Sequence, residues 1–289
     1  MNHKCIKLWI IILLAFSNSA ALSLKAQSLV DGFVQGKGHG SVVVSYSWEQ
    51  YDSFYFGAEQ RDAPPPYGGL ITTQAVSLYG IYGLTDNLDV VLNLPYIAAQ
   101  GNNEATGAEV PDQNVGGLQD VSLMLKWRPV YLEMNQGTLS FLGAVGLATP
   151  LSDYEANAVL SIGNQSTRGD IRLMTQYKAN NGLFVDMQAG YSLRSNDVPN
   201  AALLFTKIGY AGAHFYVDLW SQTQISDSDA PDIGGVPFNE TRVNSTQIGI
   251  SGYVPITGGL GLSAGVGQYV WGRNVGLATR VSGGVIYSF

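Results

Sequence analysis

The sequence has one cysteine, three histidines and few basic residues, and each shortage removes a class of function. Cys5 lies before an apolar run near the start of the chain. A chain with no later cysteine forms no disulfide framework and no cysteine-ligated metal site. Only 15 of the 289 residues are Lys or Arg, against 22 Asp or Glu. An acidic balance of this kind gives no reason to expect a nucleic-acid partner.

Long apolar runs are also lacking. The best one, Leu8–Phe16, is far shorter than the roughly 20 residues of a transmembrane helix. Lys4 and Lys7 precede this run, and small residues follow it up to a cleavage site after Ala26. This pattern predicts a secretory signal peptide at residues 1–26. The remaining chain has 12 basic and 22 acidic residues, a net charge of −10, and we expect residues 27–40 to form a flexible periplasmic segment.

Glycine and tyrosine are abundant, at 35 and 16 residues, which favours strands and tight turns over helices. About twelve segments of roughly ten residues alternate between apolar and polar positions. In residues 88–96, for example, Leu88, Leu92 and Tyr96 share one face, and Asp89 and Asn93 share the other. The same alternation marks residues 121–128, 171–177, 183–194 and 277–289, with further strands expected near Val42, Ile71, Thr138, Ala202, His214, Val243 and Leu260.

The connections between these segments alternate in length. Short turns lie at residues 84–87, 133–137, 179–182, 211–213 and 256–259, and long polar loops lie at 51–69, 98–117, 150–166 and 223–241. Outer-membrane barrels have this arrangement, with short periplasmic turns and longer external loops.

We therefore predict an all-β chain, a transmembrane antiparallel β-barrel of about 12 strands over residues 41–289. A soluble sandwich would also show alternation. The secretory signal, the even strand count and aromatic residues near strand ends favour the barrel. These aromatic residues are Trp48, Tyr96, Trp127, Tyr177 and Tyr287.

The chain ends on an aromatic residue inside an alternating segment. Because a strand edge cannot stay unpaired in lipid, we expect this last strand to close the barrel against the first. Tyr287 and Phe289 resemble the C-terminal insertion signal of bacterial outer-membrane proteins, which implies the barrel-assembly machinery as a partner.

The polar face of the predicted strands would line a lumen. Its candidate pore-lining residues are Asp89, Lys126, Arg128, Arg172, Asp186, Lys207, Asp218, Arg280 and Tyr269. The charged ones could form a ladder that acts on a passing solute, or could pair with one another and plug a narrow barrel. Phe184, Tyr216, Trp220 and Trp271 have the same inward parity, either lining a path for apolar solutes or packing as girdle residues.

The sequence contains no recognisable motif for a catalytic or metal site. His214 is the only histidine expected within a strand, and no serine or carboxylate near it forms a recognisable motif. The sequence Gly36–Gly40 resembles a phosphate loop but opens no helix. Asp227, Asp229 and Asp232 lack the other ligands of a calcium loop. We therefore predict no enzyme, no metal and no cofactor.

Three hairpins resemble a known family: YGLTDNLDVVLNLPYI (82–97), GGLQDVSLMLKWRPV (116–130) and FLGAVGLATPLSDY (141–154). They are similar to outer-membrane proteins named for the MetA pathway of phenol degradation. The resemblance implies a barrel channel encoded near genes for degrading aromatic compounds.

These observations together lead us to expect a channel in the outer membrane of a Gram-negative bacterium, in contact with lipid and lipopolysaccharide. It would take up small molecules passively, with apolar or aromatic compounds as candidates. The alternatives are a non-conducting structural or surface-binding barrel and an outer-membrane hydrolase.

Overall fold

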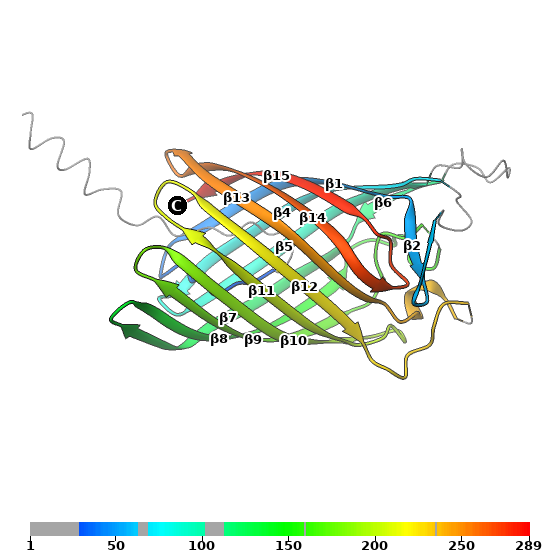
Figure 1. Ribbon diagram of the computed structural model, residues 1–289, viewed down its shortest axis with the longest axis horizontal. Helices are drawn as coiled ribbons and strands as arrows, with labels where there is room; N and C mark the ends of the chain where they lie inside the picture. The colour runs from blue at the N-terminus through cyan, green and yellow to red at the C-terminus, as the bar shows by residue number, and fades with distance from the viewer. Residues whose placement is uncertain (1–28, 63–68, 102–112, 159, 235) are drawn as a thin grey trace, which may run out of the picture.

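The computed structural model describes residues 29–62, 69–101, 113–158, 160–234 and 236–289 (Figure 1). The predicted signal peptide, residues 1–26, lies outside this part of the chain. The long strands are β1 (Gly40–Tyr51), β4 (Ile71–Thr85), β5 (Leu88–Gly101), β7 (Asp120–Met134), β8 (Gly137–Pro150), β9 (Arg168–Ala179), β10 (Leu183–Arg194), β11 (Ala201–Ala211), β12 (Tyr216–Ser226), β13 (Asn244–Thr257), β14 (Leu260–Arg273) and β15 (Thr279–Ser288).

The shorter elements are β2 (Ser53–Phe56), β3 (Glu59–Asp62), β6 (Gln113–Leu118) and a 3₁₀ turn, η1 (Phe238–Glu240). No helix within the described ranges has the length and apolar character that a membrane span requires.

All strands except β2 and β3 form one closed antiparallel sheet, and β2 and β3 pair with each other in a separate two-stranded sheet. Neighbouring barrel strands pair in chain order, apart from β6, which pairs with β5 alone, and β1 pairs with both β4 and β15. The short β6 and the long β7 pair in tandem with the two halves of β5, so the sheet has 12 positions around the barrel. At the closing seam, Gly40 and Phe289 exchange two backbone hydrogen bonds of 2.9 and 3.0 Å. This confirms the predicted barrel and explains the aromatic terminus, since closure leaves no strand edge unpaired.

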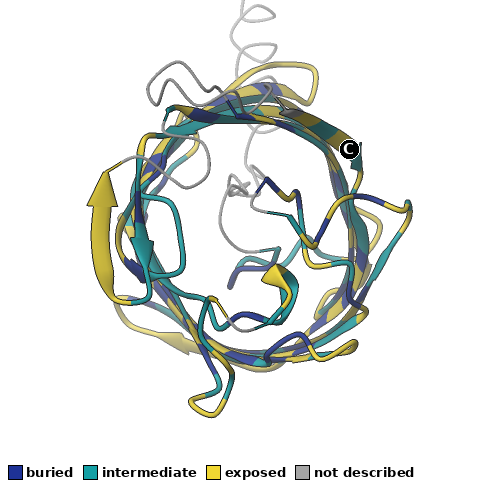
Figure 2. Ribbon diagram, turned by 90° about the vertical axis from the view of Figure 1, so that its right-hand side faces the viewer, coloured by how far each residue is buried: buried dark blue, intermediate teal, exposed yellow. Residues whose placement is uncertain are grey.

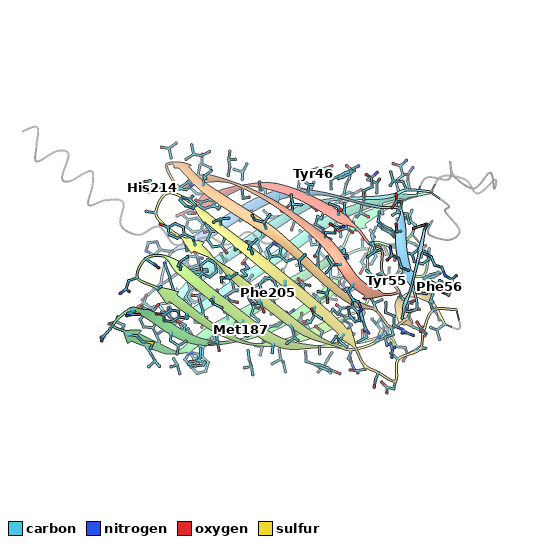
Figure 3. The ribbon with its side chains drawn as sticks, viewed as in Figure 1. Tyr46, Tyr55, Phe56, Met187, Phe205 and His214 are labelled. Carbon is cyan, nitrogen blue, oxygen red and sulfur yellow. The ribbon has the colours of Figure 1, made fainter. Side chains whose placement is uncertain are left out.

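Apolar side chains cover the outer surface of the barrel. Leu173 is 68% exposed, whereas its neighbour Met174 on the inner face is 3% exposed. Met187 projects from the outside of the wall between the buried Asp186 and Gln188 (Figure 3). In water such a surface would be costly, but in a bilayer it is the surface that lipid requires.

Short turns gather at one end of the barrel and long connections at the other (Figure 1). The turn between β13 and β14 uses Gly258 and Gly259, whose φ angles of 57° and 82° favour glycine. His214 lies in the turn before β12 and is exposed, so our prediction of a strand at that residue was wrong. We assign the short-turn end to the periplasm, as in other outer-membrane barrels.

Candidate functional site

All of the predicted lumen residues except Arg128 lie on the inner face of the barrel. Five of them have almost no exposed surface and lie toward the short-turn end. These five are Asp89, Lys126, Asp186, Lys207 and Asp218. Arg172 lies farther along β9, and Tyr269 and Arg280 lie near the long-loop end of β14 and β15.

Buried charges pair with one another at the short-turn end. The Lys126 ammonium lies 3.2 Å from Asp89 Oδ2 and 3.7 Å from Asp31 Oδ1. On the inner face of the neighbouring strands β11 and β12, Lys207 Nζ lies 3.5 Å from Asp218 Oδ2. Because these groups are out of contact with water, each needs its partner to offset the loss of hydration.

The segment before β1 lies inside the barrel, against these charges. Asp186 Oδ2 accepts a hydrogen bond of 2.6 Å from the Gly32 amide, and Lys126 donates to the Phe33 carbonyl. Asp89 accepts from the Gln35 amide at 3.3 Å. The structure therefore differs from our expectation of a flexible periplasmic segment at 27–40, since its described part, from Leu29, is held by the inner wall.

The close fit of this segment depends on small residues. A Cβ atom on Gly32 would lie 2.5 Å from both Asp186 Oδ2 and the Gln176 Cβ. A Cβ atom on Gly83 of β4 would lie 1.9 Å from the Gly36 carbonyl oxygen. Side chains larger than hydrogen would therefore push the segment off the wall at both points.

Aromatic and apolar contacts complete the packing of the segment. The Phe33 ring meets the rings of Phe184 and Tyr216 edge-on, at centroid distances of 5.2 and 6.3 Å. Val30 is 1% exposed within a cluster of inner-wall residues that includes Tyr79 and Met124. The segment thus occupies part of the lumen at the short-turn end. Figure 2 looks along the barrel axis from the opposite end and shows chain inside the ring of strands.

A loop narrows the opposite end. Tyr154, Leu160 and Ile162, from the connection between β8 and β9, are buried against Ile71 and Ala99 on the inner face of β4 and β5. The lumen is therefore constricted both by the N-terminal segment and by this loop.

Between the two constrictions, five adjacent strands carry a row of small residues on the inner face. In one row around the wall, Ala75 of β4 pairs with Ser47, Ser47 with Ser282, Ser282 with Gly265, and Gly265 with Ser251. We call this row the small-residue wall. Beside this row the Trp220 ring lies over Gly249 and Gly267, and its indole nitrogen donates to Ser251 Oγ at 3.1 Å.

β-Bulges explain why two residues predicted to face the lumen, Arg128 and Trp271, do not. The pairing of β7 with β8 shifts between Trp127 and Val130, and Arg128 turns away from the lumen to bind the Asn87 side chain at 2.9 Å. Trp271 is 46% exposed because the pairing of β13 with β14 shifts just before it. Phe184, Tyr216 and Trp220 do lie buried on the inner face.

Arginines and acids that we did not single out also face the lumen. Glu49 pairs with Arg280 across the seam, with 2.6 Å between Oε2 and a guanidinium nitrogen. Arg168 and Asp170 lie in β9, and Arg194 ends β10. Arg168 and Asp170 lie four and two residues from Arg172, and Arg194 lies eight residues from Asp186. These even spacings place them on the same face, so the alternation alone could have revealed them.

The long-loop rim carries its own polar cluster. Asp232 accepts hydrogen bonds from Arg273 and, at 2.6 Å, from the Asn274 amide, which ties the loop between β12 and β13 to the end of β14. The hydrogen bond from Arg273 lowers the pKa of Asp232 to about 2. Among the described residues, no group of three or more His, Cys, Asp or Glu side chains is arranged to hold a metal ion.

We expect Asp232→Asn to loosen this rim loop. Because the pKa of Asp232 is below its ordinary value, its ion pair stabilises the loop at neutral pH and is lost as the pH falls through about 2. Trypsin should cut after Arg242 severalfold faster in the variant at pH 7. Asp197→Asn, in a separate turn, should leave the rate unchanged, and an unchanged rate in Asp232→Asn would show that the pair does not hold the loop.

A family model described as "Putative MetA-pathway of phenol degradation" matches residues 32–282. An outer membrane channel from Pseudomonas putida F1 is similar in structure, with a TM-score of 0.69 and 16% sequence identity over 93% of this chain and 100% of that one. Among curated proteins, none matches the sequence.

Two further structures score lower. The β domain of the Bordetella autotransporter BrkA has a TM-score of 0.48 and 15% identity, over 87% of this chain and 99% of that one. The KdgM porin has a TM-score of 0.46 and 10% identity, over 86% and 99%. Both TM-scores are below 0.5, so the likeness to these two structures is weak.

Proposed function

We propose that this chain, which belongs to the MetA-pathway of phenol degradation family, is a passive channel for small apolar or aromatic molecules. It is an outer-membrane barrel and not an enzyme. The barrel replaces hydrocarbon with a polar path, so a solute can move down its gradient without cofactor or energy source.

The small-residue wall is the observation that carries this proposal. Ser47, Ser282 and Gly265 lie side by side between the two constrictions, on a face where bulky side chains would close the lumen. A solute moving along this wall would approach aromatic rings near the long-loop end, where Tyr51 and Tyr269 lie on the inner face. Such rings suit a flat, apolar ligand.

We further propose that Tyr287 and Phe289 form the signal read by the barrel-assembly machinery. Both side chains are about half exposed on the outer surface at the end of β15, where a second protein can reach them. The Phe289 ring stacks on Tyr82 with a centroid distance of 6.4 Å, which holds it in a defined orientation.

The proposed path predicts that Ser47→Tyr reduces the single-channel current of the refolded protein by more than half. The added ring would project from the small-residue wall into the lumen. Val44→Tyr is the matched control, because Val44 lies three residues earlier on the same strand and is 52% exposed on the outer surface. It should leave the current unchanged. Equal currents in both variants would contradict a path along this wall.

The apolar preference is tested in the same bilayers. Phenol added at millimolar concentration should interrupt the wild-type current more often than glucose does, because its ring can stack on the aromatic residues. Equal effects of the two solutes would contradict the aromatic preference. A folded barrel that gives no current at all would favour the alternative of a structural or surface-binding barrel.

A further inference from the structure

Three arginines lie close together on the inner wall, and two of them pair with a single carboxylate. Arg168 and Arg172 lie four residues apart in β9, and Arg194 of β10 is the strand partner of Arg168. Asp170 lies between them, 2.9 Å from Arg168 Nε and 3.7 Å from an Arg172 guanidinium nitrogen. It also accepts a hydrogen bond from Ser192.

Arg194 has no acidic partner among the residues that the structure describes. Its guanidinium donates to the Pro199 carbonyl at 3.0 Å and to Gln224 Oε1 at 3.1 Å, both of which are neutral. The cluster therefore holds three positive charges against one negative charge.

Arg172 is the least satisfied member of the cluster. Apart from the long ion pair to Asp170, its side chain has no hydrogen bond to any described residue, and its Nε atom is both buried and without a partner. Leaving a guanidinium in this condition is costly, since a charged donor removed from water needs an acceptor. An anion that reaches the lumen would supply the missing acceptor and would relieve the repulsion among the three arginines.

The cluster is reachable from the lumen and has an apolar border. The side chains of Arg168 and Arg172 are 29% and 13% exposed. In the row around the wall, Arg172 is followed by Gly190 and then by Leu203, and the Arg172 side chain lies over Gly190. Phe205 lies on the same face of β11, two residues beyond Leu203. A ligand held here would place its charged end on the arginines and its body against apolar side chains.

We propose that Arg168, Arg172 and Arg194 bind the carboxylate of an amphipathic solute with an aromatic or aliphatic body. The planar guanidinium matches a carboxylate in two parallel hydrogen bonds. The apolar side chains beside the cluster favour a carboxylate with an apolar body over a compact anion. The inference rests on the proposed function, because it makes the cluster a stopping point on the solute's path. It narrows the substrate from apolar or aromatic molecules in general to their carboxylic acids.

The test is equilibrium dialysis of the refolded protein in detergent micelles against radiolabelled benzoate. Unlabelled benzoate, benzyl alcohol and inorganic phosphate serve as competitors. Benzoate should displace the label, whereas benzyl alcohol lacks the charge and phosphate lacks the apolar body. Arg172→Gln should weaken benzoate binding by at least about tenfold, the loss expected when a hydrogen bond between charged groups is removed.

Arg128→Gln is the matched control, because it removes the same charge from the turn region outside the lumen, where Arg128 binds Asn87. It should leave benzoate binding unchanged. If Arg172→Gln does not refold, as judged by its mobility on unheated gels, Arg194→Gln takes its place, with the same expected loss.

Equal benzoate affinity in wild type and in the arginine variants would overturn the proposal, as would equal competition by phosphate. Binding in dialysis does not require conduction. A silent channel that still binds benzoate would therefore contradict the proposed function alone, and a conducting channel that does not bind it would contradict this inference alone.

Discussion

Replacing residues 29–36 with a glycine–serine linker of equal length should raise the single-channel conductance severalfold. This segment lies inside the lumen at the short-turn end, where Gly32, Phe33 and Gln35 are bound to the wall. A barrel of 12 strands is wide enough to conduct once its interior is not filled by chain. The measurement is the current through the refolded protein in a planar bilayer at fixed salt.

Gly32→Val provides a point variant with the same expected direction. A Cβ atom at this position meets Asp186 Oδ2 at 2.5 Å, so valine cannot occupy the bound position. Gly36→Ala is the control, because a Cβ atom on Gly36 meets no atom within 4 Å, although its φ of 81° makes alanine locally strained. Wild-type conductance in both the linker variant and Gly32→Val would mean that the segment does not limit the current.

Lys126→Met should lower the free energy of unfolding by about 3–5 kcal/mol, the usual cost of removing one partner from a buried ion pair. Lys126 has no exposed surface and lies within 4 Å of both Asp31 and Asp89. Its loss would leave two carboxylates buried close together with no cation between them. Urea unfolding in detergent micelles, followed by tryptophan fluorescence, measures the change.

Two further variants separate this charge effect from lost packing. Adding Asp89→Asn to Lys126→Met should recover part of the stability, because one of the stranded charges is then gone. Lys178→Met is the matched control, since Lys178 also faces inward but contacts the Phe33 ring, with 5.9 Å from Nζ to the ring centroid. A loss in Lys178→Met as large as in Lys126→Met would contradict the role given to the ion pair.

The strands could be predicted from the sequence because their alternation is strict. A two-residue period places every second side chain on one face, so Asp89 and Asp186 could be assigned to the interior from their apolar neighbours alone. The short turns carry glycine or asparagine where the backbone needs them, which fixed the strand ends near residues such as Leu88 and Leu183.

The exceptions have local physical causes. At Arg128 and at Trp271 a bulge shifts the pairing, and every residue beyond a bulge changes face relative to a simple count. The alternation of apolar and polar residues does not indicate where such a bulge lies. The sequence therefore predicts the inner face correctly only up to the first irregularity of each strand.

The position of the N-terminal segment could not be predicted for a different reason. Gly32 and Asp186 are 154 residues apart, and no local pattern connects them. Polar and glycine-rich residues such as those from Asp31 to Gly40 suit a loop in water as well as a segment packed in a lumen. The sequence also left open whether the inward charges form a ladder or pair with one another. At the short-turn end Lys126 pairs with Asp89.

The most direct test of the account is the single-channel conductance of the refolded chain, lacking residues 1–26, in a planar bilayer. We expect small, discrete openings, because the proposed path runs along the small-residue wall between the two constrictions. A protein that has folded to the barrel and yet shows no openings, even after the linker replacement of residues 29–36, would contradict it.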